Sequence, residues 1–284
     1  MNTSKGFLIF VQAGEQKDYL GQAVALAQSI KIFNKINNVT IMTNCVLTSE
    51  QRNYFDKVIG IPGTDEAQSQ DWKIQNRHKI YEASPYGETI VLDSDMLCLD
   101  SIDYWWDILG NTDLYFTNEV KNYLGEKAKT NILYRKTFIK NNLPNIYCGM
   151  FYFKKTKYND NFFAVLSEVM QNYKEYARKY CREHIQQWCS LDVSTAITCK
   201  IMKHTNKIAS PNLTFTHMKT KLQNWNVNEN WLQDIPVAYD NKLNVKINNV
   251  VQKQLLHYVQ DNFLNSELKE IIQNLWKEKT YSLA

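Results

Sequence analysis

Two acidic residues that follow an apolar run give the strongest local signal for chemistry. The segment reads Glu88-Thr-Ile-Val-Leu and continues directly into Asp93-Ser94-Asp95. Two carboxylates at the end of a buried strand repel each other and lose hydration unless a cation or a hydrogen-bonding ligand holds them there. In a regular strand both would point to the same side, so both could reach one ion, or one could bind a sugar hydroxyl instead. Because hard oxygen ligands suit Mg²⁺ or Mn²⁺, we predict a divalent metal site at Asp93 and Asp95.

The position of this Asp-x-Asp motif carries the prediction, because about one such tripeptide is expected by chance at this aspartate content. The alternative is that both aspartates end a strand in solvent and cap a helix, since a helix begins near Asp100 and Ser101. Three later acids fall at helical spacing, and a solvated helix face with a favourable first-turn charge explains them. They are Asp100, Asp103 and Asp107.

The cysteines do not predict a second metal site. The chain has six cysteines and no C-x-x-C pair. Cys181, His184 and Cys189 could be drawn as a zinc cluster, but a fourth ligand is missing. Because no secretory signal precedes them, we interpret the cysteines as reduced thiols.

Strands and helices alternate in the part of the chain that leads to the two aspartates. The predicted strands span residues 6–12, 39–43, 57–61 and 88–92, and the predicted helices span residues 17–34, 48–55 and 71–83. This alternation is typical of an α/β fold with a Rossmann-like, mostly parallel sheet flanked by helices. Ligands of such sheets bind at the carboxyl ends of the strands, where residues 93–95 would lie.

The rest of the chain continues this pattern and then becomes less regular. A helix is predicted at 102–109, strands at 113–119 and 147–154, and helices over 161–180 and 187–202, with a Lys- and Asn-rich loop between 119 and 147. Strand candidates follow at 213–218 and 254–259, before a terminal helix over 266–277. We interpret residues 1–205 as the core of a single domain, and residues 206–284 as a segment of the same globule that closes the site.

Composition favours a folded, soluble chain. The 284 residues are 44% hydrophobic, 13% aromatic and 22% charged, as in ordinary globular proteins. The net charge of +4 is too small to demand a polyanionic partner. Apolar runs are shorter than the roughly 20 residues of a membrane span, and none suits a signal-peptide core. We therefore expect a cytoplasmic protein without a membrane partner.

Several segments occur in the order and at the spacing of a known enzyme family. They are the helix with Tyr19, Ala23, Ala27 and Ser29, the strand ending IMTN, and the segments LDSDMLCLDSID, YCGMFYFKK and WCSLDVSTAI. Together they resemble the nucleotide-sugar glycosyltransferases of the GT-A fold, in particular glycosyltransferase family 8, which includes glycogenin-like enzymes. The resemblance implies a GT-A fold over most of the chain.

The resemblance also implies roles for single residues. Asp93 and Asp95, with Ser94 between them, would contact the metal and the ribose and diphosphate of the nucleotide. Arg77 corresponds to a basic residue that approaches the donor sugar or its phosphates, and the alternative for it is a surface charge. Asp192 matches an acidic residue that binds sugar hydroxyls near the reacting carbon, although Val193 stands where the family has Gln.

The end of the first strand is where the resemblance places the nucleotide base and ribose. The residues concerned are Val11, Gln12 and Ala13, together with Tyr19 on the following helix. Gly14 lacks a side chain and so permits a close approach of the backbone.

A histidine completes the metal site in family members, within the pattern H-x-x-G-x-x-K-P-W. Two segments compete for this role. HMKTKLQNW keeps the interval from His217 to Trp225, whereas QKQLLHYVQD has the better apolar strand before its histidine. We favour His257 as the ligand over His217, and expect Lys219 and Lys221 to neutralise diphosphate.

The resulting hypothesis is a metal-dependent glycosyltransferase that uses Mn²⁺ or Mg²⁺ and a nucleotide-sugar donor, most plausibly a UDP-sugar. The resemblance to family 8 implies retention of the anomeric configuration. A sugar-1-phosphate nucleotidyltransferase also places acidic metal ligands on a parallel sheet, but the first strand does not lead into its Gly-rich phosphate loop. A non-catalytic carbohydrate- or nucleic-acid-binding protein is the third alternative.

Three classes of acceptor fit this hypothesis. A glycan, a protein side chain and a modified nucleic acid are all compatible with Lys- and Asn-rich loops. The last is included because small glycosyltransferases of bacteriophages modify DNA bases, which makes a bacteriophage member of the family one expectation.

Overall fold

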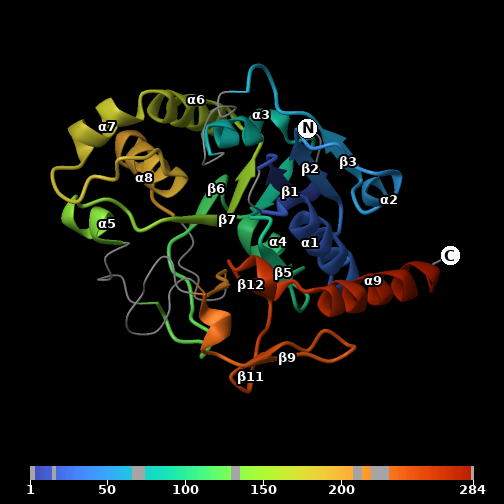
Figure 1. The fold of residues 1–284 in the computed structure, drawn as a ribbon. Helices are drawn as coiled ribbons and strands as arrows, with labels where there is room; N and C mark the ends of the chain where they lie inside the picture. Colours follow the sequence, from blue (N-terminus) through green and yellow to red (C-terminus); the bar gives the residue numbers. More distant parts are fainter. Residues whose placement is uncertain are drawn as a thin grey trace.

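A six-stranded sheet forms the centre of the computed structural model, which describes residues 4–14, 17–65, 74–128, 135–206, 213–218 and 230–282. The strand order is β3-β2-β1-β4-β7-β6 (Figure 1). These strands are β1 (Lys5–Val11), β2 (Val39–Thr43), β3 (Lys57–Ile59), β4 (Glu88–Leu92), β6 (Leu114–Thr117) and β7 (Tyr147–Lys154). The first four neighbours pair in parallel, whereas β7 is antiparallel to β4 and β6. The prediction of a mostly parallel α/β sheet is confirmed.

Helices cover both faces of the sheet, because successive side chains of a strand point to opposite faces. In β1, Phe7 and Ile9 belong to the buried cluster that includes α1, whereas Leu8 and Phe10 belong to the cluster that includes α6 and α8. The helices of the first cluster are α1 (Tyr19–Phe33) and α4 (Trp105–Leu109), and those of the second are α6 (Lys157–Gln171), α7 (Tyr173–Tyr180) and α8 (Leu191–Met202). The sheet is therefore the middle layer of three (Figure 1).

A small second sheet brings the C-terminal part of the chain to the carboxyl end of β4. Its strands are β5 (Met96–Cys98), β12 (Leu255–His257) and β8 (Thr216–His217). β12 pairs antiparallel with β5 and parallel with β8. Because β5 begins directly after the two aspartates, this pairing places residues around 257 beside them (Figure 1).

The remaining C-terminal elements complete a third buried cluster beneath this small sheet. They are η3 (Trp231–Gln233), the antiparallel strands β9 (Val237–Ala238), β10 (Lys246–Ile247) and β11 (Val250–Val251), η4 (Asp261–Phe263) and α9 (Ser266–Tyr281). The helix α9 packs along α1, so the chain end lies against the N-terminal half of the molecule (Figure 1).

Several predicted elements change in type or extent. The helix predicted over 71–83 is, within the described residues, the 3-10 helix η1 (Gln75–Lys79) followed by α3 (Ile80–Ala83). The helix predicted over 161–180 is divided at Asn172 into α6 and α7. The strand β5 was not predicted, because its three residues continue an apolar run without a local signal for a break. The remaining short helices are α2 (Ser49–Arg52) and α5 (Lys136–Lys140).

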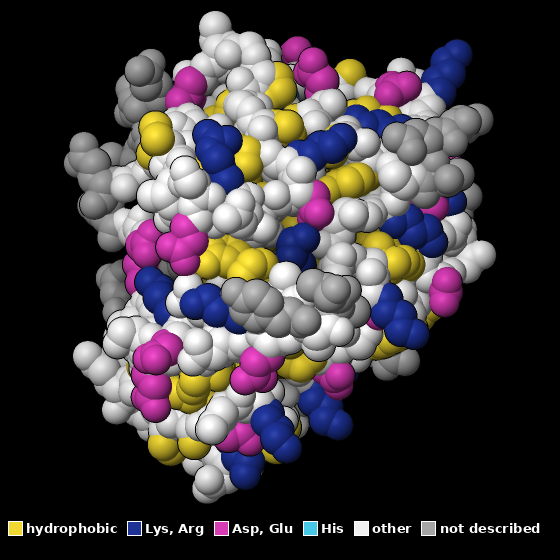
Figure 2. Space-filling model, turned by 90° about the vertical axis from the view of Figure 1, so that its right-hand side faces the viewer, with side chains coloured by type: hydrophobic (Ala, Val, Ile, Leu, Met, Phe, Trp, Pro, Cys, Tyr) yellow, Lys and Arg dark blue, Asp and Glu magenta, His cyan; other side chains and the backbone are white. Residues whose placement is uncertain are grey.

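Charges of both signs are mixed on the face that Figure 2 shows, where Lys and Arg side chains alternate with Asp and Glu side chains. A mixed surface agrees with the small net charge of +4. Among the described residues, no helix combines the length and apolar character that crossing a membrane requires.

Candidate metal site at the carboxyl end of the sheet

Asp93 and Asp95 lie on the turn that connects β4 to β5. The backbone N–H of Asp93 donates to the carbonyl of Gly149 on β7 at 2.9 Å, and the carbonyl of Asp95 accepts from Tyr258 N–H at 3.2 Å. The regular strand ends at Leu92, so Asp93 and Asp95 do not continue it as strand residues with side chains on one face. The two carboxylates therefore converge because the turn is held from both sides, and Ser94 between them is buried.

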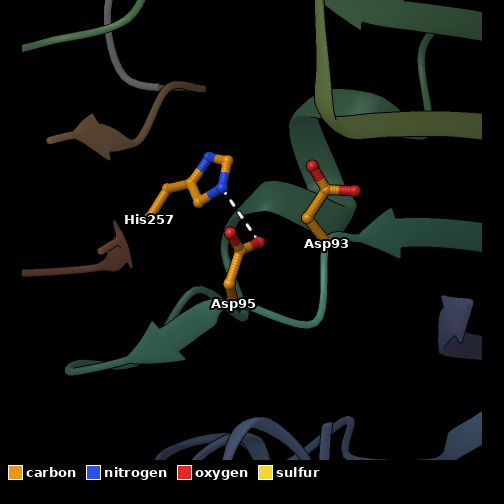
Figure 3. A group of neighbouring side chains, drawn as sticks. All are labelled: Asp93, Asp95 and His257. Carbon is orange, nitrogen blue, oxygen red and sulfur yellow. Dashed lines mark ion pairs between the residues drawn. The ribbon is translucent and has the colours of Figure 1, made fainter. Parts of the chain in front are cut away.

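His257 joins the two aspartates in a group that could hold a cation. One ligand atom from each of Asp93, Asp95 and His257 lies within 4.8 Å of the others. Figure 3 shows the Asp95 carboxylate facing the His257 ring, with Asp93 beside them. His257 Nε2 is 2.9 Å from Asp95 Oδ1. His257 reaches this place because it pairs with Met96 in the small sheet. Two carboxylates and one imidazole form a donor set that fits a divalent ion.

Asp95 is ionised at neutral pH. Burial alone would raise the pKa of its carboxyl group, but the charge of His257 and its hydrogen bond outweigh burial and lower the pKa to about 2. A metal ligand must be deprotonated, so Asp95 is ready to bind a cation over the physiological pH range.

His217, the competing candidate, lies next to His257 on the neighbouring strand. The two residues are register partners, and their ring centroids are 4.6 Å apart. His217 is nevertheless outside the group whose ligand atoms converge on the aspartates. The structure thus places both histidines together, with His257 on the side of Asp95.

Arg77 compensates the charge of the other aspartate. It lies on η1, and its guanidinium donates to Asp93 Oδ1 at 2.6 Å. Burial would lower the pKa of Arg77, but Asp93 more than reverses this and the pKa is raised, so the side chain stays cationic. Each aspartate of the motif therefore has its own partner.

The end of β1 lies beside this pair and is fixed by polar contacts. The amide of Gln12 donates to the carboxylate of Asp65 at 2.7 and 2.8 Å and accepts from Asn76 at 3.1 Å. The backbone N–H of Ala13 donates to Asn44 Oδ1 at 2.8 Å. Val11 is buried and Ala13 is exposed. The chain therefore leaves the core at the end of β1, where the nucleotide base and ribose are predicted to bind.

Tyr19 begins α1 and faces the acidic groups. Burial raises the pKa of its phenol to about 12, and the charges of Asp95 and Asp261 contribute to this rise. The hydroxyl is therefore protonated at neutral pH and can donate a hydrogen bond. A side-chain carbon at Gly14 would lie 3.7 Å from the Tyr19 ring, which is ordinary contact.

Asp192 lies in the first turn of α8, whose N-terminus is capped by Ser190. Its Oδ1 accepts from the backbone N–H of Cys148 at 2.8 Å, and its Oδ2 accepts from Arg135 at 3.0 Å. Arg135 is fully buried between the rings of Phe138 and Tyr147, at 3.8 and 3.9 Å from their centroids. A buried guanidinium needs such a partner, and the pair fixes the orientation of the Asp192 carboxylate.

Gly149 on β7 connects the Asp93–Asp95 pair with Asp192. It accepts from Asp93, and the preceding residue Cys148 donates to Asp192. A side-chain carbon at position 149 would lie 2.9 Å from Met96 Cε and 3.4 Å from Asp93 Oδ2. A side chain at position 149 would therefore have to displace the end of Met96, and glycine lets β7 approach the turn without this shift.

Sequence reasoning missed several residues that shape the site. Arg135, Asp65 and Asn76 had no local signal, because each acts through a partner that is distant in the sequence. Lys219 and Lys221, which were predicted to meet diphosphate, lie outside the described residues. The six cysteines are free.

Comparison with known proteins shows similarity only at the level of structure. No protein-family model matches the chain, and no curated protein matches it. An active-site mutant of LgtC superposes on 96% of this chain and 95% of its own, with a TM-score of 0.51 and 12% identity. The apo-form glycosyltransferase GlyE of Streptococcus pneumoniae TIGR4 covers 96% of this chain with a TM-score of 0.50 and 12% identity. The chain has the GT-A fold.

The matched structures differ in length from this chain. The chain covers 60% of GlyE and 38% of the bifunctional glycosyltransferase WbbM, so it spans less than two thirds of both. It covers nearly all of the LgtC mutant, and the expected GT-A architecture with a single domain is confirmed. At this level of identity the likeness establishes the fold, and the activity has to be argued from the site.

Removing one carboxylate should remove metal binding. We expect Asp95→Asn to weaken Mn²⁺ binding by more than about tenfold, because a neutral amide replaces an ionised ligand. Electron paramagnetic resonance of free Mn²⁺ would measure this change. Asp107→Asn, which alters an exposed acid on α4, is the matched control and should bind Mn²⁺ like the wild type. Equal Mn²⁺ affinity of the two variants would contradict the assignment.

Removing the buried guanidinium should destabilise the fold. We expect Arg135→Met to lower the free energy of unfolding by about 3–5 kcal/mol, because Asp192 loses the guanidinium that compensates its charge. Arg178→Met on the exposed face of α7 should change it by less than about 0.5 kcal/mol. Urea denaturation followed by circular dichroism would measure both. If Arg135→Met combined with Asp192→Asn is as unstable as the sum of the single variants, the two residues are not coupled.

Proposed function

We propose that this protein is a metal-dependent glycosyltransferase whose nucleotide-sugar donor is a UDP-sugar. The observation that carries the proposal is the convergence of Asp93, Asp95 and His257 at the carboxyl end of a GT-A sheet. In a parallel α/β sheet this edge is the usual place for ligands. A binding protein would not need two neighbouring carboxylates and a histidine at that point.

Glycosyl transfer has a specific electrostatic requirement. The bond between the sugar C1 and the phosphate oxygen breaks, positive charge builds on the ring, and negative charge builds on the departing diphosphate. A bound divalent ion would act as a Lewis acid toward that diphosphate. Asp93, Asp95 and His257 would hold the ion, and the imidazole in the donor set favours Mn²⁺ over Mg²⁺.

Arg77 and Asp192 are the residues we assign to the donor sugar. Arg77 lies beside Asp93, so its remaining N–H groups would orient the sugar or its phosphates. Asp192 would accept from sugar hydroxyls near C1, in the orientation that Arg135 and Cys148 fix. Val193 cannot replace the amide that the family has at that position. By resemblance to family 8 we also propose that the anomeric configuration is retained.

The nucleotide would lie along the end of β1. Val11, Gln12 and Ala13 would meet the base and ribose, with Tyr19 at the side of the acidic groups. Lys219 and Lys221 remain candidates for the diphosphate. A glycan, a protein side chain and a modified nucleic acid remain the acceptor classes of the proposal.

Thermal shift with nucleotides tests this function without knowledge of the acceptor. We expect UDP or a UDP-sugar to raise the melting temperature by about 5 °C when Mn²⁺ is present, since a ligand at 100 times its Kd stabilises by about 2.7 kcal/mol. UDP without metal should give a much smaller shift. Asp95→Asn should abolish the shift, and Asp107→Asn should keep it.

Other outcomes would point to the other classes. Stabilisation that requires a nucleoside triphosphate and a sugar 1-phosphate would indicate a nucleotidyltransferase. Binding of a glycan or nucleic acid without a response to nucleotides would indicate a non-catalytic binding protein. Either result would contradict the proposed glycosyltransferase.

A further inference from the structure

Lys17 places a second cation close to the candidate metal site. It lies on the segment between β1 and α1, and its Nζ is 3.4 Å from Asp261 Oδ1 in η4. Asp261 also accepts from the amide of Gln22 on α1 at 2.9 Å. Lys17 on the segment after β1 therefore contacts Asp261, which lies four residues after His257 in the sequence.

Two independent observations place this ion pair beside the triad. Tyr258, which follows His257, donates its backbone N–H to Asp95 at 3.2 Å, so the chain leads from Asp95 directly toward Asp261. Tyr19, at the start of α1, is near enough to both acids that the charges of Asp95 and Asp261 are, after burial, the largest influences on the pKa of its phenol. The charge of Lys17 also acts on Asp95, after burial and His257.

The two cations near the aspartates differ in how firmly they are held. Arg77 donates to Asp93 at 2.6 Å. Lys17 is at the longer distance of 3.4 Å from Asp261, and both side chains of that pair are 38% exposed. An ion pair exposed to this extent contributes little to stability, so its lysine can exchange partners at little cost.

We infer that Lys17 binds the diphosphate of the nucleotide and exchanges its contact with Asp261 for a phosphate oxygen. This inference rests on the proposed function. An ammonium group is a compact charge with three donors, which suits phosphate oxygens. A phosphate next to the metal triad would come within reach of a flexible lysine that already lies at its border. Asp261 holds Lys17 near the site until the nucleotide arrives.

The first test compares two lysines that tie the same segment to the C-terminal part. Lys17 pairs with Asp261, and Lys269 on α9 pairs with Asp18 at 3.3 Å. Titration calorimetry with UDP at saturating Mn²⁺ should show Lys17→Met binding UDP about tenfold more weakly, the range for a hydrogen bond to a charged group. Lys269→Met should stay within twofold of the wild type. Mn²⁺ affinity without nucleotide should not be weakened in either variant.

The second test separates phosphate binding from anchoring of the segment. If Lys17 binds phosphate, Asp261→Asn releases it and removes a negative charge, so UDP should bind more tightly. If Lys17 only anchors the segment through Asp261, then Asp261→Asn should weaken UDP binding as Lys17→Met does. The two variants change UDP affinity in opposite directions in the first case and in the same direction in the second.

The outcomes distinguish this inference from the proposed function. Wild-type protein that binds UDP with Mn²⁺, together with Lys17→Met of equal affinity, would overturn the role of Lys17 and leave the glycosyltransferase proposal intact. Parallel weakening in Lys17→Met and Asp261→Asn would overturn it as well. Failure of the wild type to bind UDP in the presence of Mn²⁺ would contradict both.

Discussion

The repulsion between the carboxylates of Asp93 and Asp95 is the constraint on which the site depends. The two residues lie at the ends of a turn. Gly149 on β7 holds the Asp93 end by a backbone hydrogen bond, and Tyr258, which follows β12, holds the Asp95 end. The fold lowers the cost by giving Arg77 to one carboxylate and His257 to the other. The sheets position these groups, because β7 lies next to β4 and holds the Asp93 end of the turn, and β12 pairs with β5 and brings His257 to Asp95.

The backbone of β7 also connects the metal site to Asp192. Gly149 accepts from Asp93 while Cys148, its neighbour, donates to Asp192, so one strand end sets the relative position of two carboxylates. Burial raises the pKa of the Cys148 thiol well above its usual range, which keeps it neutral between them.

The sequence predicted the parts of the site that follow from local patterns. The apolar run before Asp93 and the run before His257 both indicated strands, and the end of the first strand lies at the edge of a parallel sheet, where ligands bind. The small sheet that brings His257 there was not predicted. The turn at residues 93–95 and the short strand β5 left no such signal. The pairs of Arg135 with Asp192 and of Lys17 with Asp261 join distant segments, so only tertiary packing reveals them. The GT-A fold was predicted from the order of its segments, which survives at low identity.

Each acid already has a partner before a ligand binds, and this affects how the site would bind a cation. The contacts of Asp93, Asp95 and Asp192 are made by residues of the chain itself, so the carboxylates are oriented without a ligand. A cation that binds His257 Nε2 must replace the hydrogen bond to Asp95, and it does so at a nitrogen already aimed at the same space. Metal binding would then require little rearrangement, because the ordering cost is met when the chain folds.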